Sequence, residues 1–471
     1  MKSPGNQQTG SVQTGALVQG KSPGKNLDIN PSKNQSKNQN KNKSIDQSAA
    51  GSQAGALLSR ATSAQRLARG LLFRQLEKIT RGTLVIDEGD QVLRFGETAP
   101  DALTAHVVVS DPAFYQAVAF NGSIGGGESY MQQQWHSPDL VALVRIMVSN
   151  LDVVQGMDSD KSWLAVLMNK LRHLRNRNTL DRARRNIAAH YDLSNEFFAS
   201  FLDPSMMYSS AIFKDDSQSL HEASLNKLTH ICERLQLKPG DHLLEIGTGW
   251  GAMAIHAAKH FGCKVTTTTI SREQYQFASQ RVADEGLQDR VTLLLSDYRD
   301  LQGTFDKLVS IEMIEAVGHE YFANYFAKCS SLLKPDGLML IQAITISDQR
   351  YQQSLREVDF IQRYIFPGGC LPCNSAIASH IARVTDLQIV GLEDITRDYA
   401  ITLAHWRKTF LARARDIQAM GFGTDFIRMW DYYLAYCQGG FMERVIHTAQ
   451  FLMAKPDCRL EPLHARIPTG R

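Results

Sequence analysis

The chain has 471 residues, of which 43% are hydrophobic, and its formal net charge is only +3. That length exceeds one typical domain and indicates two domains and a tail. No apolar run approaches the roughly 18 residues that span a bilayer. Because the N-terminal stretch is polar, we do not expect a signal peptide. Seven scattered cysteines favour a reducing cytoplasm over a disulfide framework, and the lone C-x-x-C at Cys370 and Cys373 predicts loop packing, with no metal site.

Residues 1–55 are a low-complexity segment of Asn, Gln, Ser, Gly and Lys. Such a composition buries too little apolar surface to offset the entropy lost on ordering. Six lysines between Lys21 and Lys43 outnumber Asp28 and Asp46. We therefore predict a disordered basic tail, most simply a solvated extension, with weak attraction to anionic lipid or nucleic acid as the alternative.

Residues 56–151 predict a small α+β N-terminal domain. Residues 83–86 and 92–95 read as a hairpin, and residues 105–109 as a third strand. A helix is expected after Asp111-Pro112. A glycine-rich turn is expected at residues 122–131.

Residues 152–186 predict a basic helical linker. Seven basic residues from Lys170 to Arg185 face one acid, Asp181, beside apolar residues such as Trp163 and Leu167. This pattern is typical of an amphipathic helix on an anionic membrane surface. An ordinary solvated helix fits equally well. Nucleic acid is not expected as a partner, because the segment has no recognition motif and the tail has no aromatics for base stacking.

The stretch 243–251 predicts a nucleotide site. A short apolar strand containing Glu245 leads into glycines at 247, 249 and 251 and then into a helix. This G-x-G-x-G differs from the dinucleotide G-x-G-x-x-G, and the second strand (264–270) has no acid for a ribose. No Gly-Lys-Ser/Thr follows, so a phosphate-binding loop is excluded. The pattern favours a nucleoside without phosphate, such as S-adenosylmethionine, although a structural turn without ligand remains an alternative.

From residue 187 to 471 strands alternate with helices. We expect strands at 264–269, 291–295, 305–313 and 338–346, with helices at 271–285 and 321–333 and a turn at 334–337. This alternation predicts an α/β fold with a doubly wound, Rossmann-like parallel sheet. Ligands bind such sheets beyond the carboxyl ends of the strands. The glycine turn, residues 269–271, 297–298 and 312–315 should therefore surround one crevice.

Seven ordered motifs resemble the cyclopropane-fatty-acyl-phospholipid synthases. They lie at residues 190–195, 207–213, 235–240, 269–274, 297–301, 364–372 and 398–406. The resemblance extends from about Gly122 to the C-terminus and includes that family's lipid-associated N-terminal domain. It implies a class I methyltransferase fold, S-adenosylmethionine as donor, and a cis double bond of a membrane phospholipid as substrate. It also implies a homodimer located in the cytoplasm, peripherally on the inner face of the membrane.

The resemblance further implies a bound bicarbonate as the base that removes a proton during ring closure. Carried onto this chain, its carboxylate contact is Glu315, its tyrosine is Tyr399, and its backbone contact on the fifth strand is Ile344. Two positions depart from the family pattern: Ser210 replaces a cysteine and Gln342 replaces a histidine, and an amide cannot titrate. Cys437 matches a cysteine once assigned as catalytic, but an alkene needs no thiol, so packing is the favoured role.

Aromatic side chains should wall a dry channel for the hydrocarbon and stabilise a carbocation. The candidates are Tyr208, Phe213, Phe360, Tyr364, Phe366 and Trp406. The cofactor side is predicted from motif position. Its candidates are Tyr191, Tyr208, Ser209, Glu245, Gly247, Thr248, Gly249, Trp250, Gly251, Thr269, Ile270, Ser271, Gln274, Asp297 and Tyr298.

Three functions stay open on the sequence. The first is a cyclopropane synthase acting on phospholipid. The second is a methyltransferase of the same fold that makes methyl-branched or methylene lipids or acts on another small substrate, which the departures at Gln342 and Ser210 keep open. The third is a non-catalytic lipid-binding relative, against which the intact glycine turn, Glu315 and Tyr399 argue.

Overall fold

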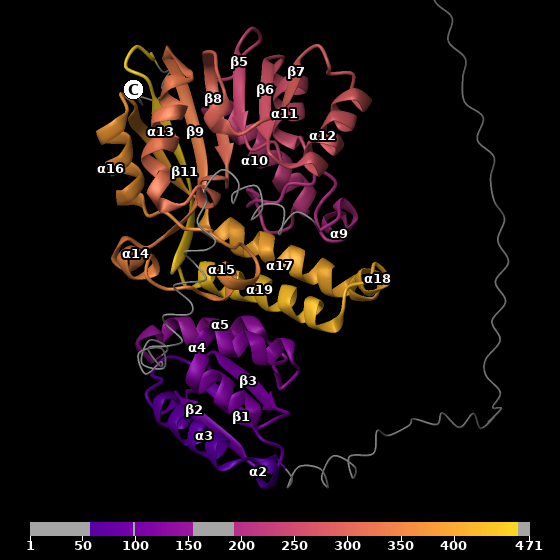
Figure 1. Cartoon of the computed structure of the whole chain (residues 1–471), viewed down its shortest axis with the longest axis vertical. Helices are drawn as coiled ribbons and strands as arrows, with labels where there is room; N and C mark the ends of the chain where they lie inside the picture. The colour runs from indigo at the N-terminus through magenta and orange to yellow at the C-terminus, as the bar shows by residue number, and fades with distance from the viewer. Residues whose placement is uncertain (1–56, 98, 154–192, 460–471) are drawn as a thin grey trace, which may run out of the picture. The chain divides into compact units, whose positions relative to one another are not determined.

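The computed structural model describes residues 57–97, 99–153 and 193–459 (Figure 1). The predicted tail and nearly all of the predicted basic linker lie outside the described residues, and so does Tyr191. Within the described ranges, no helix is both long and apolar enough to cross a membrane.

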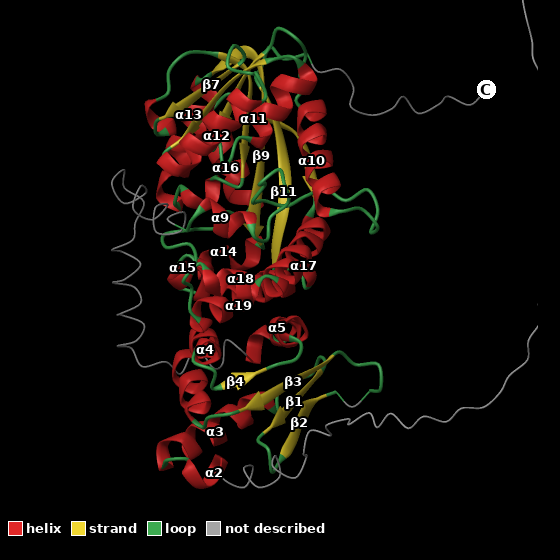
Figure 2. Cartoon of the chain, turned by 90° about the vertical axis from the view of Figure 1, so that its right-hand side faces the viewer, coloured by secondary structure: helices red, strands yellow, loops and turns green. Residues whose placement is uncertain are grey.

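A four-stranded sheet forms from the first part of the described chain (Figure 2). β1 pairs antiparallel with β2, which confirms the predicted hairpin, and parallel with β3. α5 packs on β1 and β3, while α3 packs on α4. The elements are α2 (Leu57–Arg60), α3 (Ser63–Leu76), β1 (Thr83–Asp87), β2 (Val92–Gly96), β3 (Thr104–Val109), α4 (Ala113–Met131), β4 (Trp135–His136) and α5 (Leu140–Ser149).

The glycine-rich turn predicted at residues 122–131 is wrong, because this segment is the second half of α4. The helix is kinked at Gly122, where φ is 54° and ψ is −134°. A Cβ on Gly125 would lie 1.9 Å from the carbonyl oxygen of Ala117, and a Cβ on Gly127 would lie 2.4 Å from the Phe360 ring. These glycines therefore allow close packing of the helix rather than reversal of the chain.

A seven-stranded sheet follows in the order β10-β11-β9-β8-β5-β6-β7. The strands β5 to β9 are parallel, as the sequence predicts. β11 pairs antiparallel with β9 and β10, so the sheet is mixed at this edge. The strands are β5 (His242–Ile246), β6 (Lys264–Thr269), β7 (Val291–Leu295), β8 (Phe305–Ile311), β9 (Leu333–Ile346), β10 (Gln388–Asp394) and β11 (Ile446–Ala454).

Helices cover both faces of this sheet (Figure 1), which is the doubly wound arrangement. On β5, Leu244 and Ile246 pack in the cluster that contains α13 and α16, whereas Leu243 packs in the cluster that contains α10, α11 and α12. Such alternation is expected of a strand buried on both faces. The helices are α9 (Asn195–Ala199), α10 (Leu220–Arg234), α11 (Ala252–His256), the π-helix η2 (Ala257–Phe261), α12 (Arg272–Asp284), η3 (Tyr298–Asp300), η4 (Ile314–Ala316), η5 (His319–Tyr321), α13 (Phe322–Ser331), α14 (Asp348–Ser354), α15 (Phe360–Tyr364), α16 (Asn374–Val384), α17 (Thr396–Ala412), α18 (Ala414–Ala419) and α19 (Thr424–Met442).

One predicted turn proves to be part of a strand. β9 begins at Leu333 rather than Leu338, so residues 334–337 lie within it. The pairing of β8 with β9 shifts register between Phe305 and Lys307, opposite this Pro- and Gly-containing segment. An irregular register is the usual way for a strand to accept a proline.

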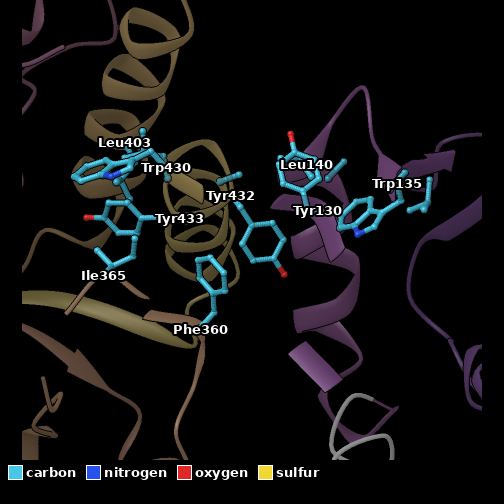
Figure 3. Close-up of a cluster of buried hydrophobic side chains, with 14 of the residues drawn as sticks. Tyr130, Trp135, Leu140, Phe360, Ile365, Leu403, Trp430, Tyr432 and Tyr433 are labelled. Atoms are coloured by element: carbon cyan, nitrogen blue, oxygen red, sulfur yellow. The ribbon is translucent and has the colours of Figure 1, made fainter. Parts of the chain in front are cut away.

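Aromatic residues join α4 to α19 (Figure 3). The rings of Tyr130 and Tyr432 lie 5.8 Å apart, and Tyr432 packs edge-on against Phe360 at 4.8 Å. The hydroxyl of Tyr130 donates to Asp431 at 2.7 Å. This buried contact connects the four-stranded part of the chain to the helices beside the seven-stranded sheet.

Candidate active site

The glycine turn after β5 presents its backbone to a cavity. Gly247 and Gly249 have φ of 102° and 52°, a region that other residues rarely adopt. An added Cβ on Gly249 meets nothing within 4 Å, and both glycines line the cavity. Gly251, also at positive φ, is the N-cap of α11 and faces Ala278 instead.

The cavity has a volume of about 1070 Å³. Pockets for one small ligand usually measure about 300–1,000 Å³, so this cavity lies at the upper end of that range. At one end it is lined by the glycine turn and the ends of β6 and β7. At the other it is lined by apolar residues of the four-stranded part, including Leu72, Leu76, Phe114 and Val118.

The first end fits S-adenosylmethionine. Most of the residues that the sequence predicts on the cofactor side line the cavity there: Tyr208, Ser209, Glu245, Gly247, Thr248, Gly249, Trp250, Thr269, Ile270, Gln274, Asp297 and Tyr298. Ser271 does not line the cavity, because its hydroxyl caps α12 by accepting from the Gln274 N–H at 3.2 Å. The open glycine backbone provides the close approach that a nucleoside without phosphate needs.

The polar groups at this end are held by neighbours. Burial raises the pKa of Glu245 to about 8, and Thr267 donates to its carboxylate at 2.7 Å. Asp297, which is 2% exposed, already receives two bonds from the Arg299 guanidinium at 2.8 and 2.7 Å. Asp297 therefore enters the site as half of an ion pair.

The Glu312 carboxylate accepts hydrogen bonds from the groups that, by the resemblance, would hold bicarbonate. Its Oε1 accepts from the Ser210 N–H at 2.9 Å and from the Gln342 amide at 2.8 Å. Its Oε2 accepts from the Tyr399 hydroxyl at 2.8 Å. Burial raises the pKa of Glu312, while these donors and the nearby Lys227 act in the opposite direction. The residues present thus do not fit a bicarbonate bound in this cage, because a side-chain carboxylate occupies it.

The backbone at Glu312 is strained. Its φ is 49°, in the left-handed region that favours glycine. A residue other than glycine held there costs on the order of 1–3 kcal/mol and is typical of functional sites. From the sequence, residue 312 is expected in the crevice, without a predicted role. Its functional role could have been inferred from its position at the end of the fourth predicted strand, three residues before Glu315.

Glu315 lies beside this cage. The Ile344 N–H donates to its Oε1, and its Oε2 is buried without a hydrogen-bond partner. Burial, and after it the charge of Glu312, raises the pKa of Glu315 to about 8. The two carboxyls line the same cavity, and the raised pKa of Glu315 favours its protonated form near neutral pH.

Lys227, for which the sequence predicts no role, is buried against Ser209. Its ammonium donates to the Ser209 hydroxyl at 2.6 Å, and the residue is 0% exposed. Burial lowers its pKa to about 8, and Glu312, Asp203 and Glu245 raise it again. Lys227 therefore supplies positive charge to the carboxylates on both the cofactor side and the base side.

The aromatic wall differs in part from the prediction. Tyr208 and Phe366 line the cavity, but Phe213, Phe360, Tyr364 and Trp406 do not. Phe213 instead stacks on His405, and Phe360 fills the contact between α4 and α19. Further aromatic residues take part in the lining, namely Trp250, Tyr399, Tyr432, Tyr433, Tyr436 and Phe441.

Cys437 also lines the cavity. Burial raises the pKa of its thiol, so a thiolate nucleophile is disfavoured. Cys370 and Cys373 are both free thiols, and among the described residues no group of His, Cys, Asp and Glu is arranged to hold a metal ion.

Comparison with known proteins also points to a lipid methyltransferase that uses S-adenosylmethionine. Residues 178–451 match the family described as "Mycolic acid cyclopropane synthetase". The chain is 38% identical to tuberculostearic acid methyltransferase of Mycobacterium tuberculosis over 350 residues, which is 73% of this chain and 81% of that protein. It is 37% identical to cyclopropane-fatty-acyl-phospholipid synthase of Escherichia coli over 366 residues, or 77% of this chain and 91% of that protein.

A solved structure of mycolic acid cyclopropane synthase CmaA1 with SAH and CTAB superposes with a TM-score of 0.54. It is 30% identical in sequence, and the match covers 58% of this chain and 98% of that one. The chain therefore belongs to the cyclopropane synthetase family, as an S-adenosylmethionine-dependent lipid methyltransferase.

Proposed function

We propose that the protein forms a cyclopropane ring on a cis double bond of a phospholipid acyl chain, with Glu312 as the built-in base. The single observation that carries this proposal is the Glu312 carboxylate, which is held by Ser210, Gln342 and Tyr399 and lines an apolar cavity next to the glycine turn. The name of the Escherichia coli relative supports a phospholipid substrate. The resemblance supports a homodimer at the inner face of the membrane.

S-adenosylmethionine, when bound, supplies an electrophilic methyl carbon that adds to one alkene carbon and leaves a positive charge on the other. The alkene is a weak nucleophile, so the protein contributes chiefly by positioning. The backbone at Gly247 and Gly249 sets the donor at one end of the cavity, and the apolar lining holds the hydrocarbon at the other.

The positive charge on the substrate needs stabilisation in a dry site. Tyr208 and Tyr433 line the cavity, and their hydroxyls are hydrogen-bonded to each other at 2.9 Å. That bond fixes the orientation of the two rings, and aromatic faces attract cations most strongly where water is excluded. We assign these tyrosines to cation stabilisation.

Ring closure requires loss of one proton from the transferred methyl group. The electron pair of that C–H bond closes the three-membered ring, and the Glu312 carboxylate accepts the proton. Burial raises the pKa of Glu312, but the three donors favour its ionised form, and burial together with the charge of Glu312 raises the pKa of the neighbouring Glu315 to about 8, which favours the neutral form there. The net change to the lipid is a gain of one CH2.

A second candidate is a methylated lipid without a ring. Two observations favour it: Gln342 and Glu312 stand where the family pattern has a histidine and a bicarbonate, and one relative is named a tuberculostearic acid methyltransferase. If the base removes a different proton, the product gains the same CH2 but keeps a carbon–carbon double bond.

Mass spectrometry of lipids from cells that express the chain, with and without ozonolysis, tests the proposal. A cyclopropane lipid has gained CH2 and resists ozonolysis. A methylene or unsaturated methyl-branched lipid has gained CH2 but is cleaved. The absence of any lipid with added CH2, despite binding of S-adenosylmethionine, would overturn both candidates.

A further inference from the structure

Helix α3 carries apolar residues on two opposite faces. One face packs inward through Ala68, Leu72 and Leu76. On the other face, Leu67 and Leu71 are 64% and 42% exposed. They are four residues apart and so are neighbours on one side of the helix. Together they form a small exposed apolar patch on the outer side of the helix.

The outer face of α3 is also basic. Arg74 is exposed and follows Leu71 by three residues, which places it on the same stripe, and Arg66 is exposed at its flank. No Asp or Glu occurs from residue 57 to residue 76, and Glu77 follows as the C-cap. Arg69 does not add to this charge, because its guanidinium pairs with the buried Glu88. Apolar residues flanked by cations fit an anionic lipid surface.

The inner face of the same helix opens onto the reaction cavity. Leu72 and Leu76 of α3 and Phe114 and Val118 of α4 line the cavity that also contains Glu312. The hydrophobic space is therefore continuous from the proposed base to the underside of α3 and α4, which pack together (Figure 2).

The neighbouring helix α4 is interrupted near this region. Phe120 is 46% exposed, and two residues later the helix is kinked at Gly122. Gly122 and Ser123 line the cavity. Phe120 is therefore exposed two residues before a kink whose residues line the cavity.

We propose that the outer face of α3 with Phe120 of α4, here called the docking face, rests on an anionic phospholipid bilayer and admits an acyl chain to the cavity. This inference rests on the proposed function for its substrate. It adds the place at which the enzyme meets the membrane and the route of the acyl chain, both within the predicted lipid-associated domain.

The test uses the full-length protein and vesicles of equal parts phosphatidylglycerol and phosphatidylcholine with cis-unsaturated chains. The variant is Leu67→Asp/Leu71→Asp. The matched control is Ile389→Asp/Leu392→Asp on β10, where the exposed fractions are 38% and 50%. Sedimentation measures vesicle binding, and product formation is measured both on vesicles and on the same phospholipid dispersed in detergent.

The docking variant should bind vesicles more weakly by on the order of tenfold or more, because two inserted apolar side chains are lost and two negative charges are added. Its activity on vesicles should fall in parallel, while its activity on detergent-dispersed lipid and its affinity for S-adenosylmethionine stay at the wild-type level. Arg74→Glu should weaken binding to these vesicles but not to pure phosphatidylcholine.

Wild-type binding by the docking variant overturns the proposal, and so does an equal loss in the β10 control. A variant that keeps vesicle binding but dissociates from a dimer, measured by light scattering, assigns the face to a second copy of the chain instead. A wild-type protein that binds vesicles through this face yet adds no CH2 to any lipid contradicts the proposed function and leaves the docking face standing.

Discussion

Tyr399 of α17 donates its phenolic hydrogen to Glu312 at the end of β8, across 2.8 Å. Burial, and after it Glu312, raises the pKa of Tyr399 well above its usual value, so the phenol remains a donor throughout the working pH range. The bond connects the parallel sheet to the helical segment that follows it. It also orients the second oxygen of a carboxylate whose first oxygen is held by Ser210 and Gln342.

Without bicarbonate, Glu312→Gly is expected to abolish product formation. Added bicarbonate is expected to restore it in this variant. Glycine adopts the φ of 49° at this position without strain, so the fold should persist. The empty cage of Ser210, Gln342 and Tyr399 then accepts a small external carboxylate. Activity with and without bicarbonate in degassed buffer measures the rescue. The wild-type protein should be indifferent to bicarbonate.

Gln133→Gly is the matched control, because Gln133 also has a positive φ, of 61°, and is exposed. It is distant in sequence from Glu312 and Glu315. It should match the wild-type activity in both buffers. A wild-type enzyme that stops working when bicarbonate is removed would show that Glu312 is not the base.

Tyr399→Phe is expected to move the acidic limb of kcat/KM to higher pH. A hydrogen bond donated to a carboxylate favours the charged form, so its removal raises the pKa of Glu312 and delays formation of the active base. Hydrogen bonds to charged groups contribute roughly 1.5–3 kcal/mol, which corresponds to a shift of about one to two pH units. A pH–rate profile measures the shift.

Tyr115→Phe controls for loss of a buried phenol, since Tyr115 donates to Glu88 in the four-stranded part of the chain. It should lower stability without moving the profile. An unmoved acidic limb in Tyr399→Phe, with Tyr115→Phe behaving as expected, contradicts the assignment of Glu312.

Sequence periodicity predicted much of this fold for physical reasons. Strands buried on both faces form runs of apolar or β-branched residues, so β5 to β9 were predictable, β6 through its threonines. The hairpin was predictable from two short β-branched and apolar segments around a Gly-containing turn, and the glycine turn after β5 predicted the cofactor end of the cavity. Glycines inside α4 were misread, because only the partner surfaces, such as Phe360 near Gly127, show that they serve packing. The role of Glu312 depends on donors from residues 210, 342 and 399, which no local pattern brings together.

Gly249→Ala is expected to weaken binding of S-adenosylmethionine by at least about tenfold. The added Cβ points into open space at a φ of 52°, where it both strains the turn and occupies the ligand's approach. Gly240→Ala is the matched control, because Gly240 has a φ of 97° and equally open surroundings but does not line the cavity. Isothermal titration calorimetry measures both. Equal affinities in the two variants contradict the placement of the cofactor at this turn.

Glu315→Gln is expected to flatten the pH dependence of stability. The folded-state pKa of Glu315 is about 8, whereas an unfolded glutamate titrates near about 4.3. Between these values the folded protein holds a proton that the unfolded chain has released. The stability from this group is therefore complete below about pH 4.3 and is lost as pH rises through about 8. Glutamine does not titrate, so the variant should lose less stability over that window, by an amount on the order of a few kcal/mol.

Urea unfolding at about pH 5, 6.5 and 8.5 measures this difference directly. Glu245 and Lys227 also titrate near pH 8, but they are present in both proteins and cancel when the variant is compared with the wild type. Glu285→Gln is a suitable control, because Glu285 is exposed and forms a surface ion pair with Lys259. Parallel pH curves for Glu315→Gln and the wild type would mean that Glu315 is ionised at neutral pH. The carboxyl pair would then carry two charges, and Glu312 would lose the neutral neighbour on which its role as base depends.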